Sequence, residues 1–164
     1  TGDVLDYISD LIPKCNRITL VDLCKPLLSI AEQRIKDNKW ENYVEIIQDD
    51  VTHFKSDIQY DLILITYSLT MIPNWIQTLD NSKLLLKKDG YIGISDFCIS
   101  PYQINISKLF WKKIFSYDRV YLNEDHITYT DLIFKKVFRE YKKGGFPFIP
   151  LLKCPYYFSL HKNI

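Results

Sequence analysis

The sequence predicts an α/β domain built on a Rossmann-like, mostly parallel sheet. Short apolar runs alternate with amphipathic helical segments along the 164 residues, which is the pattern of strand–helix–strand units. Several of these runs end on an acid or a hydroxyl residue, where parallel sheets bind their ligands. We therefore expect helices on both faces of the sheet, an antiparallel C-terminal strand, and one domain over residues 1–164.

The first half of the chain supplies three predicted strands. Residues 17–22 form a β-branched run that ends on Asp22, and residues 43–47 and 60–66 form two more. The run at 60–66 is almost wholly apolar, as expected for a strand covered on both faces. After the first strand, Pro26 opens a predicted helix whose apolar face carries Leu27, Leu28, Ala31 and Ile35.

The second half continues the alternation. A helix is predicted from Pro73 to Leu86, and residues 87–90 end it with two lysines and a glycine. The remaining predicted elements are a strand at 91–96, a helix at 105–115, and a closing pair of strands at 134–141 and 156–161.

Composition narrows the class of protein. Apolar residues make up 47% and charged residues 25% of the chain, which is typical of a globular domain. No apolar run approaches the ~20 residues that span a bilayer, and the first residues lack the basic start of a signal peptide. We therefore expect a cytoplasmic protein. Because the cysteines form no C-x-x-C pair, we expect reduced, mostly buried thiols and no metal site at Cys15, Cys24, Cys98 and Cys154.

The charge is distributed unevenly. Residues 1–80 carry 7 basic and 13 acidic side chains, giving −6, and residues 81–164 carry 14 and 7, giving +7. A basic half can favour an anionic surface such as nucleic acid or lipid headgroups. The positive charge of the second half is explained equally well by lysines that lie on helices and are solvated by water.

Polar residues at the strand ends are the candidate binding residues. In a parallel sheet they would share one rim, formed by Asp22, Asp49, Asp50, Thr66, Tyr67, Ser68 and Asp96. The carboxylate of Asp22 offers two acceptor oxygens, enough for both hydroxyls of a ribose. Each acid taken singly could equally be a helix cap or a turn residue.

At these positions the sequence resembles the class I S-adenosylmethionine-dependent methyltransferases. The resemblance lies in residues 20–23, 48–54, 60–68 and 84–92. It implies S-adenosylmethionine as cofactor, with Asp22 on the ribose, Asp50 on the adenine amino group and Val51 supplying a backbone amide. The cofactor-binding residues implied are Gly2, Asp22, Leu23, Asp50, Val51, Tyr67 and Ser68.

A narrower resemblance is to the methyltransferase of betaine-lipid synthesis. The strings at 65–75 and 150–157 carry it, together with 95–97, 110–111 and 123–126. That family methylates the amine of diacylglycerylhomoserine three times. The resemblance implies a lipid or small-molecule amine substrate, peripheral membrane contact, no nucleic acid, and in some members fusion to an aminocarboxypropyl transferase. The alternatives are a generic small-molecule methyltransferase and a catalytically inactive module of a larger protein.

The chain departs from these families at its start. Family members begin with a first strand and a glycine-rich loop, whereas Thr1-Gly2 is similar to the end of that loop. We expect an N-terminally truncated domain without its first strand and loop. The strands at 18–22 and 62–66 would then be underpaired and the isolated chain marginally stable.

Methyl transfer to an amine needs a nitrogen with a free lone pair, so a proton must first leave the ammonium. The candidate catalytic residues are Tyr67, Asp96 and His126, although His126 could equally be a turn residue. Aromatic rings can hold a methylated cation, and the candidate substrate residues are Met71, Trp75, Tyr156 and Tyr157. A basic cluster (Lys135, Lys136, Arg139, Lys142 and Lys143) precedes the aromatic–proline segment 146–150 and suits an anionic membrane surface.

Overall fold

The computed structural model describes residues 2–99, 105–117, 120–123, 125–146 and 149–164, without the side chains of 146 and 149–152. Its chain forms two compact units, unit 1 (Thr1–Phe54) and unit 2 (Lys55–Ile164). Residues 1–164, which we expected to form one domain, are therefore described as two units. The predicted aromatic–proline segment 146–150 lies outside the described side chains.

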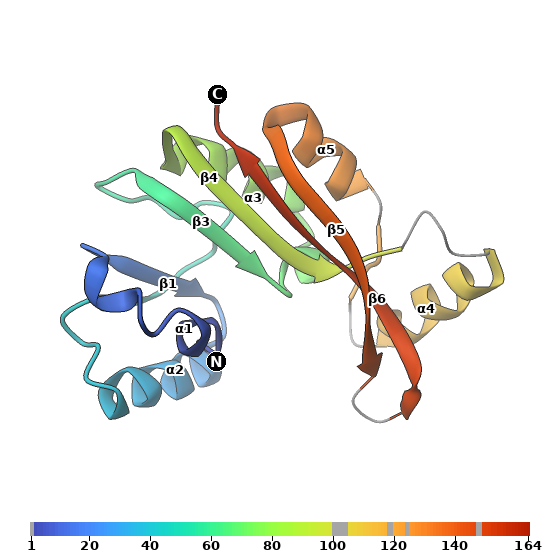
Figure 1. The fold of residues 1–164 in the computed structure, drawn as a ribbon, viewed down its shortest axis with the longest axis horizontal. Coiled ribbons are helices and arrows are strands. Elements are labelled where there is room, and N and C mark those ends of the chain that lie inside the picture. Colours follow the sequence, from blue (N-terminus) through green and yellow to red (C-terminus); the bar gives the residue numbers. More distant parts are fainter. Residues whose placement is uncertain (1, 100–104, 118–119, 124, 147–148) are drawn as a thin grey trace. The chain divides into compact units, whose positions relative to one another are not determined.

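Unit 1 is a two-stranded parallel sheet with helices packed on it (Figure 1). Strand β1 pairs with β2 in register from Ile18↔Val44 to Asp22↔Gln48. The core of the unit consists of Leu5, Ile12, Ile35, Trp40 and Val44. Its elements are α1 (Val4–Tyr7), η1 (Ile12–Lys14), β1 (Ile18–Asp22), α2 (Lys25–Asp37) and β2 (Val44–Gln48).

Unit 2 contains a four-stranded mixed sheet in the order β3-β4-β6-β5. Strands β3 and β4 are parallel, and β6 runs antiparallel to both β4 and β5. The predicted antiparallel C-terminal strand is thus confirmed. Its elements are β3 (Tyr60–Thr66), η2 (Leu69–Met71), α3 (Trp75–Leu85), β4 (Leu86–Phe97), α4 (Asn105–Tyr117), α5 (Asp125–Ile133), β5 (Lys135–Phe146) and β6 (Ile149–Lys162).

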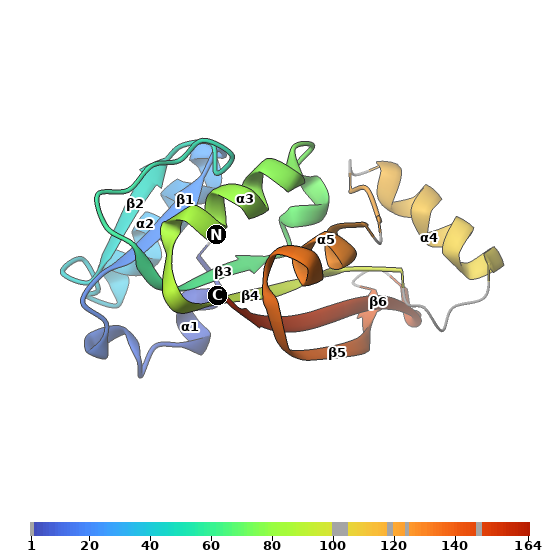
Figure 2. The ribbon, with the colours of Figure 1, turned by 90° about the horizontal axis from the view of Figure 1, so that it is seen from above.

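Helices α3 and α5 cover one face of the sheet of unit 2 (Figure 2). Because side chains alternate along a strand, Ile92, Ile94 and Tyr157 point to this face and are buried with Leu79 of α3. The opposite face leaves Leu62, Leu64 and Phe138 exposed. Residues 63 and 65 of β3 belong to the core, so this strand is covered on one face of unit 2 rather than on two.

Among the described residues, β1 is hydrogen-bonded to β2 alone and β3 to β4 alone. Each of these two strands therefore has an edge without a strand partner within its own unit. Such an edge presents backbone donors and acceptors that another strand can pair with.

Gly90 does not end α3 in the way the sequence predicts. The helix ends at Leu85 and β4 begins directly at Leu86, while the left-handed residue is Asp89, with φ of 65°. A Cβ at Gly90 would lie 3.0 Å from the carbonyl oxygen of Lys87 and 3.2 Å from that of Asp61. Glycine is required here because the backbone of β3 passes close by, not because of its φ.

The cysteines differ in exposure. Cys98 and Cys154 are buried, Cys15 is partly buried and Cys24 is exposed. Burial raises the pKa of the Cys154 thiol to about 12. The expectation of mostly buried thiols thus holds for two of the four. No helix within the described ranges is long and apolar enough to cross a bilayer.

Candidate functional site

In unit 2, the chain turns sharply where β3 ends. Tyr67 follows Thr66 with φ of 50°, a left-handed conformation that is uncommon for a residue with a side chain. Its N–H donates to the carbonyl oxygen of Ser95 at 2.7 Å, which ties this turn to β4. The Tyr67 ring packs on Phe97 at 5.2 Å between centroids and stays 44% exposed. Strain held in this way at a strand end is typical of a functional position.

Asp96 fixes the loop that follows Tyr67. Its carboxylate accepts from the Thr70 N–H at 3.0 Å, the Thr70 hydroxyl at 2.8 Å and the Phe97 N–H at 2.7 Å. The side chain is 0% exposed. Burial raises the pKa of Asp96, and these hydrogen bonds oppose the rise. The arrangement holds η2 and therefore Met71, which is exposed, and Ser68, which is half-buried.

The burial of Asp96 bears on its predicted role as a base toward the acceptor, which stays a prediction. A general base must reach the proton that it removes, whereas Asp96 is enclosed by Thr70 and Phe97. Its hydrogen bonds to Thr70 hold the loop in place. Thr70 lies within the string 65–75, but no local pattern points to its contact with Asp96, because the two residues are 26 positions apart.

His126 is buried among aromatic rings on the core face of the sheet. It stacks on Tyr157 at 5.8 Å and meets Trp75 edge-on at 6.3 Å. Burial lowers the pKa of His126 to about 4, against the opposing effect of Asp125, so the ring is neutral at pH 7. With 1% exposure it does not reach a substrate at the surface of unit 2. His126 lies on the buried face of α5 rather than in a turn, and its role as a base stays a prediction.

The three aromatic candidates for the substrate do not gather around one space in unit 2. Tyr156 and Tyr157 are neighbours on β6 and therefore point to opposite faces of the sheet. Tyr157 is buried with His126, while Tyr156 contacts Phe158 at 5.3 Å. Trp75 packs in the core against Tyr129 at 5.8 Å. Of the four candidate substrate residues, Met71 is the one with an exposed side chain.

In unit 1, Asp22 closes the turn between β1 and α2. Its Oδ1 accepts from the Cys24 N–H at 2.8 Å, and Oδ2 has no partner among the described residues. Leu23, between them, is exposed. Asp22 therefore has an acceptor oxygen available at the carboxyl end of a strand.

Asp50 forms a second turn after β2. Its Oδ1 accepts from the Thr52 N–H at 2.9 Å and the Thr52 hydroxyl at 2.7 Å. These hydrogen bonds lower the pKa of Asp50, so its carboxylate is ionised at neutral pH. The turn fixes the backbone of Val51, which is partly buried.

Gly2 lies against α2 in a left-handed conformation, with φ of 67°. A Cβ at this position would lie 3.1 Å from the Cβ of Ala31. Glycine is therefore favoured at this position for two reasons: its positive φ and its close approach to α2.

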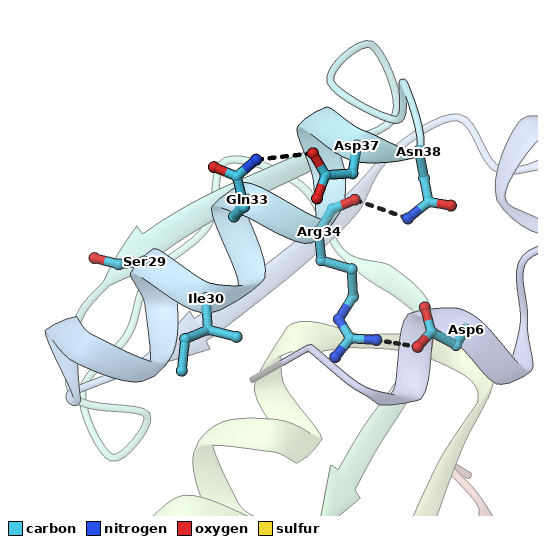
Figure 3. A pocket seen from close by; sticks show the side chains of 7 residues that line it. All are labelled: Asp6, Ser29, Ile30, Gln33, Arg34, Asp37 and Asn38. Atoms are coloured by element: carbon cyan, nitrogen blue, oxygen red, sulfur yellow. Dashed lines mark hydrogen bonds and ion pairs between the residues drawn. The ribbon is translucent and has the colours of Figure 1, made fainter.

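These features of unit 1 fit S-adenosylmethionine. The hydroxyls of a ribose need a hydrogen-bond acceptor such as the free oxygen of Asp22, and an adenine amino group needs an acceptor such as the ionised Asp50. Gly2 has no side chain, so the backbone there can approach a ligand closely. None of the predicted residues lines the surface hollow beside α2 shown in Figure 3, formed by Asp6, Ser29, Ile30, Gln33, Arg34, Asp37 and Asn38. A second hollow, around α3 and the C terminus, contains none of them either.

Comparison with known proteins identifies the family. The family described as "Methyltransferase domain" matches residues 1–92. The chain belongs to this family. A demethylmenaquinone methyltransferase from Lactobacillus johnsonii is 25% identical over 116 residues, which cover 70% of this chain and 47% of that protein. The chain thus spans about half the length of this relative.

Solved methyltransferase structures share the fold. The N-methyltransferase NodS from Bradyrhizobium japonicum, in complex with S-adenosyl-L-homocysteine, is 18% identical with a TM-score of 0.70, covering 96% of this chain and 71% of NodS. A candidate methyltransferase from Bacillus halodurans is 13% identical with a TM-score of 0.78, covering 96% and 88%.

The resemblance to class I S-adenosylmethionine-dependent methyltransferases is therefore confirmed, as is the Rossmann-like α/β fold with an antiparallel C-terminal strand. S-adenosylmethionine is the cofactor that this family and fold imply. The roles of individual residues stay predictions.

Proposed function

We propose that the protein is an S-adenosylmethionine-dependent N-methyltransferase whose acceptor is the amine of diacylglycerylhomoserine. The observation that carries the proposal is the turn after β3, where Tyr67 is held in a left-handed conformation with its ring exposed. The string at 65–75 that contains it resembles the betaine-lipid methyltransferases. The NodS neighbour is itself named as an N-methyltransferase.

The predicted residues would have different roles in the reaction. Asp22, Leu23, Asp50, Val51 and Gly2 would hold the cofactor, which supplies a methyl group on a positively charged sulfur. Tyr67, Ser68 and Met71 would line the acceptor position. The amine lone pair forms the new N–C bond as the C–S bond breaks, and the proton lost beforehand passes to solvent.

Tyr67 is the exposed member of the three predicted catalytic residues. Its hydroxyl would accept a hydrogen bond from the incoming amine and orient the lone pair, while Asp96 acts through Thr70 to keep the loop in place. Orientation of this kind is the main contribution that an enzyme makes to an in-line displacement. Residues 67–71 would thus set the position of the acceptor.

A generic small-molecule methyltransferase is the second candidate. The Lactobacillus relative is named for demethylmenaquinone, a different acceptor class. An inactive module is the third alternative. The reaction that makes the homoserine headgroup would come from an aminocarboxypropyl transferase, as a fused or partner domain.

The deciding experiment supplies labelled S-adenosylmethionine with either diacylglycerylhomoserine in vesicles or a water-soluble amine. Methylation of the lipid up to the trimethylated product supports the proposal. Transfer to the soluble amine alone supports the generic enzyme, and no transfer to either supports the inactive module.

Cofactor binding is tested separately by calorimetry on Asp22→Asn. Losing a charge-assisted hydrogen bond is expected to weaken S-adenosylmethionine binding by about 30- to 150-fold. Asp10→Asn, at an exposed acid of the same unit, serves as the matched control and should bind as the unmodified protein does. Equal affinity for both variants would reject Asp22 as the ribose ligand.

A further inference from the structure

Helix α4 exposes an apolar stripe. Ile106 is 80% exposed, Leu109 71%, Phe110 45% and Tyr117 78%. Residues three, four and seven apart lie on the same side of a helix, so these four side chains form one surface, here called the α4 stripe. Exposed large apolar groups that gather in this way mark an interaction surface rather than scattered exposure.

The exposure is not a sign of an unpacked helix. Trp111 and Phe115, on the other side of α4, are 3% and 4% exposed. They are buried in a cluster with Ile99, Leu122 and Cys154. The helix is thus anchored to unit 2 by one face and presents a second apolar face outward.

The charge of α4 is of one sign. Away from its anchored face the helix carries Lys112 and Lys113, and residues 105–117 contain no acid. By helical spacing Lys113 falls within the stripe and Lys112 at its border. A helix with apolar residues on one face and lysines beside them suits the interface of an anionic bilayer, where lysine stems reach up to the headgroups.

The exposed apolar face of the sheet in unit 2 has a different chemistry. Around Leu62, Leu64 and Phe138, the lysines are paired with acids: Lys87 with Asp61 at 2.8 Å, Lys162 with Asp89 at 2.7 Å and Lys142 with Glu140 at 3.2 Å. Acids therefore offset the charge of these three lysines on that face. The α4 stripe differs from it because residues 105–117 contain no acid.

We propose that α4 docks the protein on the surface of an anionic lipid bilayer, with the α4 stripe entering the boundary between headgroups and acyl chains. The lysines contact anionic headgroups, and each contributes about tenfold or less to binding at low salt. This site lies apart from the basic cluster at 135–143 that the sequence suggested.

The docking surface is connected to the turn after β3. Ring contacts run from Tyr67 to Phe97 at 5.2 Å, from Phe97 to Phe115 at 4.8 Å and from Phe115 to Trp111 at 5.7 Å. The Tyr121 N–H also donates to the Thr70 carbonyl oxygen at 2.9 Å. In Figure 1, α4 lies beyond the carboxyl end of β4. Docking through α4 would bring residues 67–71 near the bilayer surface, a consequence that rests on the proposed function.

Vesicle co-sedimentation tests the docking without cofactor or substrate. The full chain is mixed with phosphatidylcholine vesicles with or without phosphatidylglycerol, at low and high salt. We expect binding to the anionic vesicles that weakens with salt. The double variant Ile106→Glu/Leu109→Glu should lose about tenfold or more of this binding. Lys112→Glu/Lys113→Glu should lose the preference for anionic vesicles.

Leu132→Glu is the matched control, because Leu132 is 77% exposed on another helix of the same unit, α5. It should bind vesicles as the unmodified protein does, and circular dichroism should show all variants folded. The proposal is overturned if the unmodified chain does not bind, if Leu132→Glu loses as much binding as the α4 variants, or if the stripe instead holds two copies together in sedimentation. Vesicle binding without lipid methylation would reject the proposed acceptor and leave the docking intact.

Discussion

Unit 1 and unit 2 place their charges differently. In unit 1 the ion pairs lie at the surface, as with Arg17 and Glu45 at 2.6 Å. In unit 2, the Asp131 carboxylate accepts hydrogen bonds from both terminal guanidinium nitrogens of the largely buried Arg139, at 2.5 and 2.8 Å. It also lies 2.9 Å from Nε2 of the fully buried His161. Although burial opposes it, hydrogen bonds from Arg139 and His161 hold the pKa of Asp131 at about 2.

The difference shows which interactions each unit depends on. A surface ion pair contributes little because water solvates both charges well. A buried charge is costly unless its partner is present, so the groups of unit 2 are required together. We expect unit 2 to be sensitive to single polar changes and to pH, and unit 1 to respond mainly to changes in its small core.

The largest expected effect is Leu79→Ala in α3. Leu79 is fully buried against the sheet of unit 2, and the cavity left by the truncation should lower the free energy of unfolding by about 2–5 kcal/mol. Leu5 of unit 1 is equally buried but lies in a four-residue helix, which can collapse more easily. Leu5→Ala is therefore expected at the lower end of that range. Equal losses in urea unfolding would contradict the comparison of the two cores.

Acid should destabilise the protein through His126. Its pKa is about 4 in the folded protein, against 6.5 for a histidine in an unfolded chain. Between these values the unfolded state binds more protons, so stability falls as pH is lowered from 6.5 to 4, by about 3 kcal/mol in total. Burial also lowers the pKa of His161, which acts in the same direction. Thermal unfolding across this range measures the effect.

The control for this prediction compares a histidine from each unit. His126→Gln should flatten the dependence of stability on pH, whereas His53→Gln, at an exposed histidine of unit 1, should leave it as it was. If both variants retain the full dependence, His126 is not its source.

How far the sequence predicted the molecule depends on whether the information was local. The runs at 18–22, 44–48 and 60–66 became strands because alternating or continuous apolar residues suit a sheet. A turn at Asp22 or Asp50 was one of the alternatives for the same reason, since each acid accepts a hydrogen bond from the backbone two residues away.

Contacts distant in sequence were not foreseen. Residues 125–133 are rich in β-branched side chains and have low helix propensity, yet they form α5 because Ile127 and Thr130 are buried in unit 2. That packing also encloses His126. Asp96 is likewise buried by a contact with Thr70, which is distant in sequence. As a result, two of the three predicted catalytic residues, Asp96 and His126, are not exposed at the surface.

The smallest expected effect is Glu45→Gln in unit 1. Glu45 accepts from Arg17 and from the Thr19 hydroxyl at 2.5 Å, but all three groups are partly exposed. The free energy of unfolding should fall by less than about 1 kcal/mol. A loss in urea unfolding as large as that of Leu79→Ala would show that the surface pairs of unit 1 matter more than their exposure suggests.

The position of β6 determines when the sheet of unit 2 can be completed. Its residues come last in the sequence, yet β6 lies between β4 and β5, and Tyr91 pairs with Lys162. During synthesis, β4 emerges before β6, its partner on one edge, which is made some seventy residues later. At about 5–20 residues per second this delay lasts several seconds. The strands of unit 1 can pair as soon as residue 48 emerges. The nascent chain therefore spends that interval with one edge of β4 open, and an open strand edge of this kind is prone to aggregation.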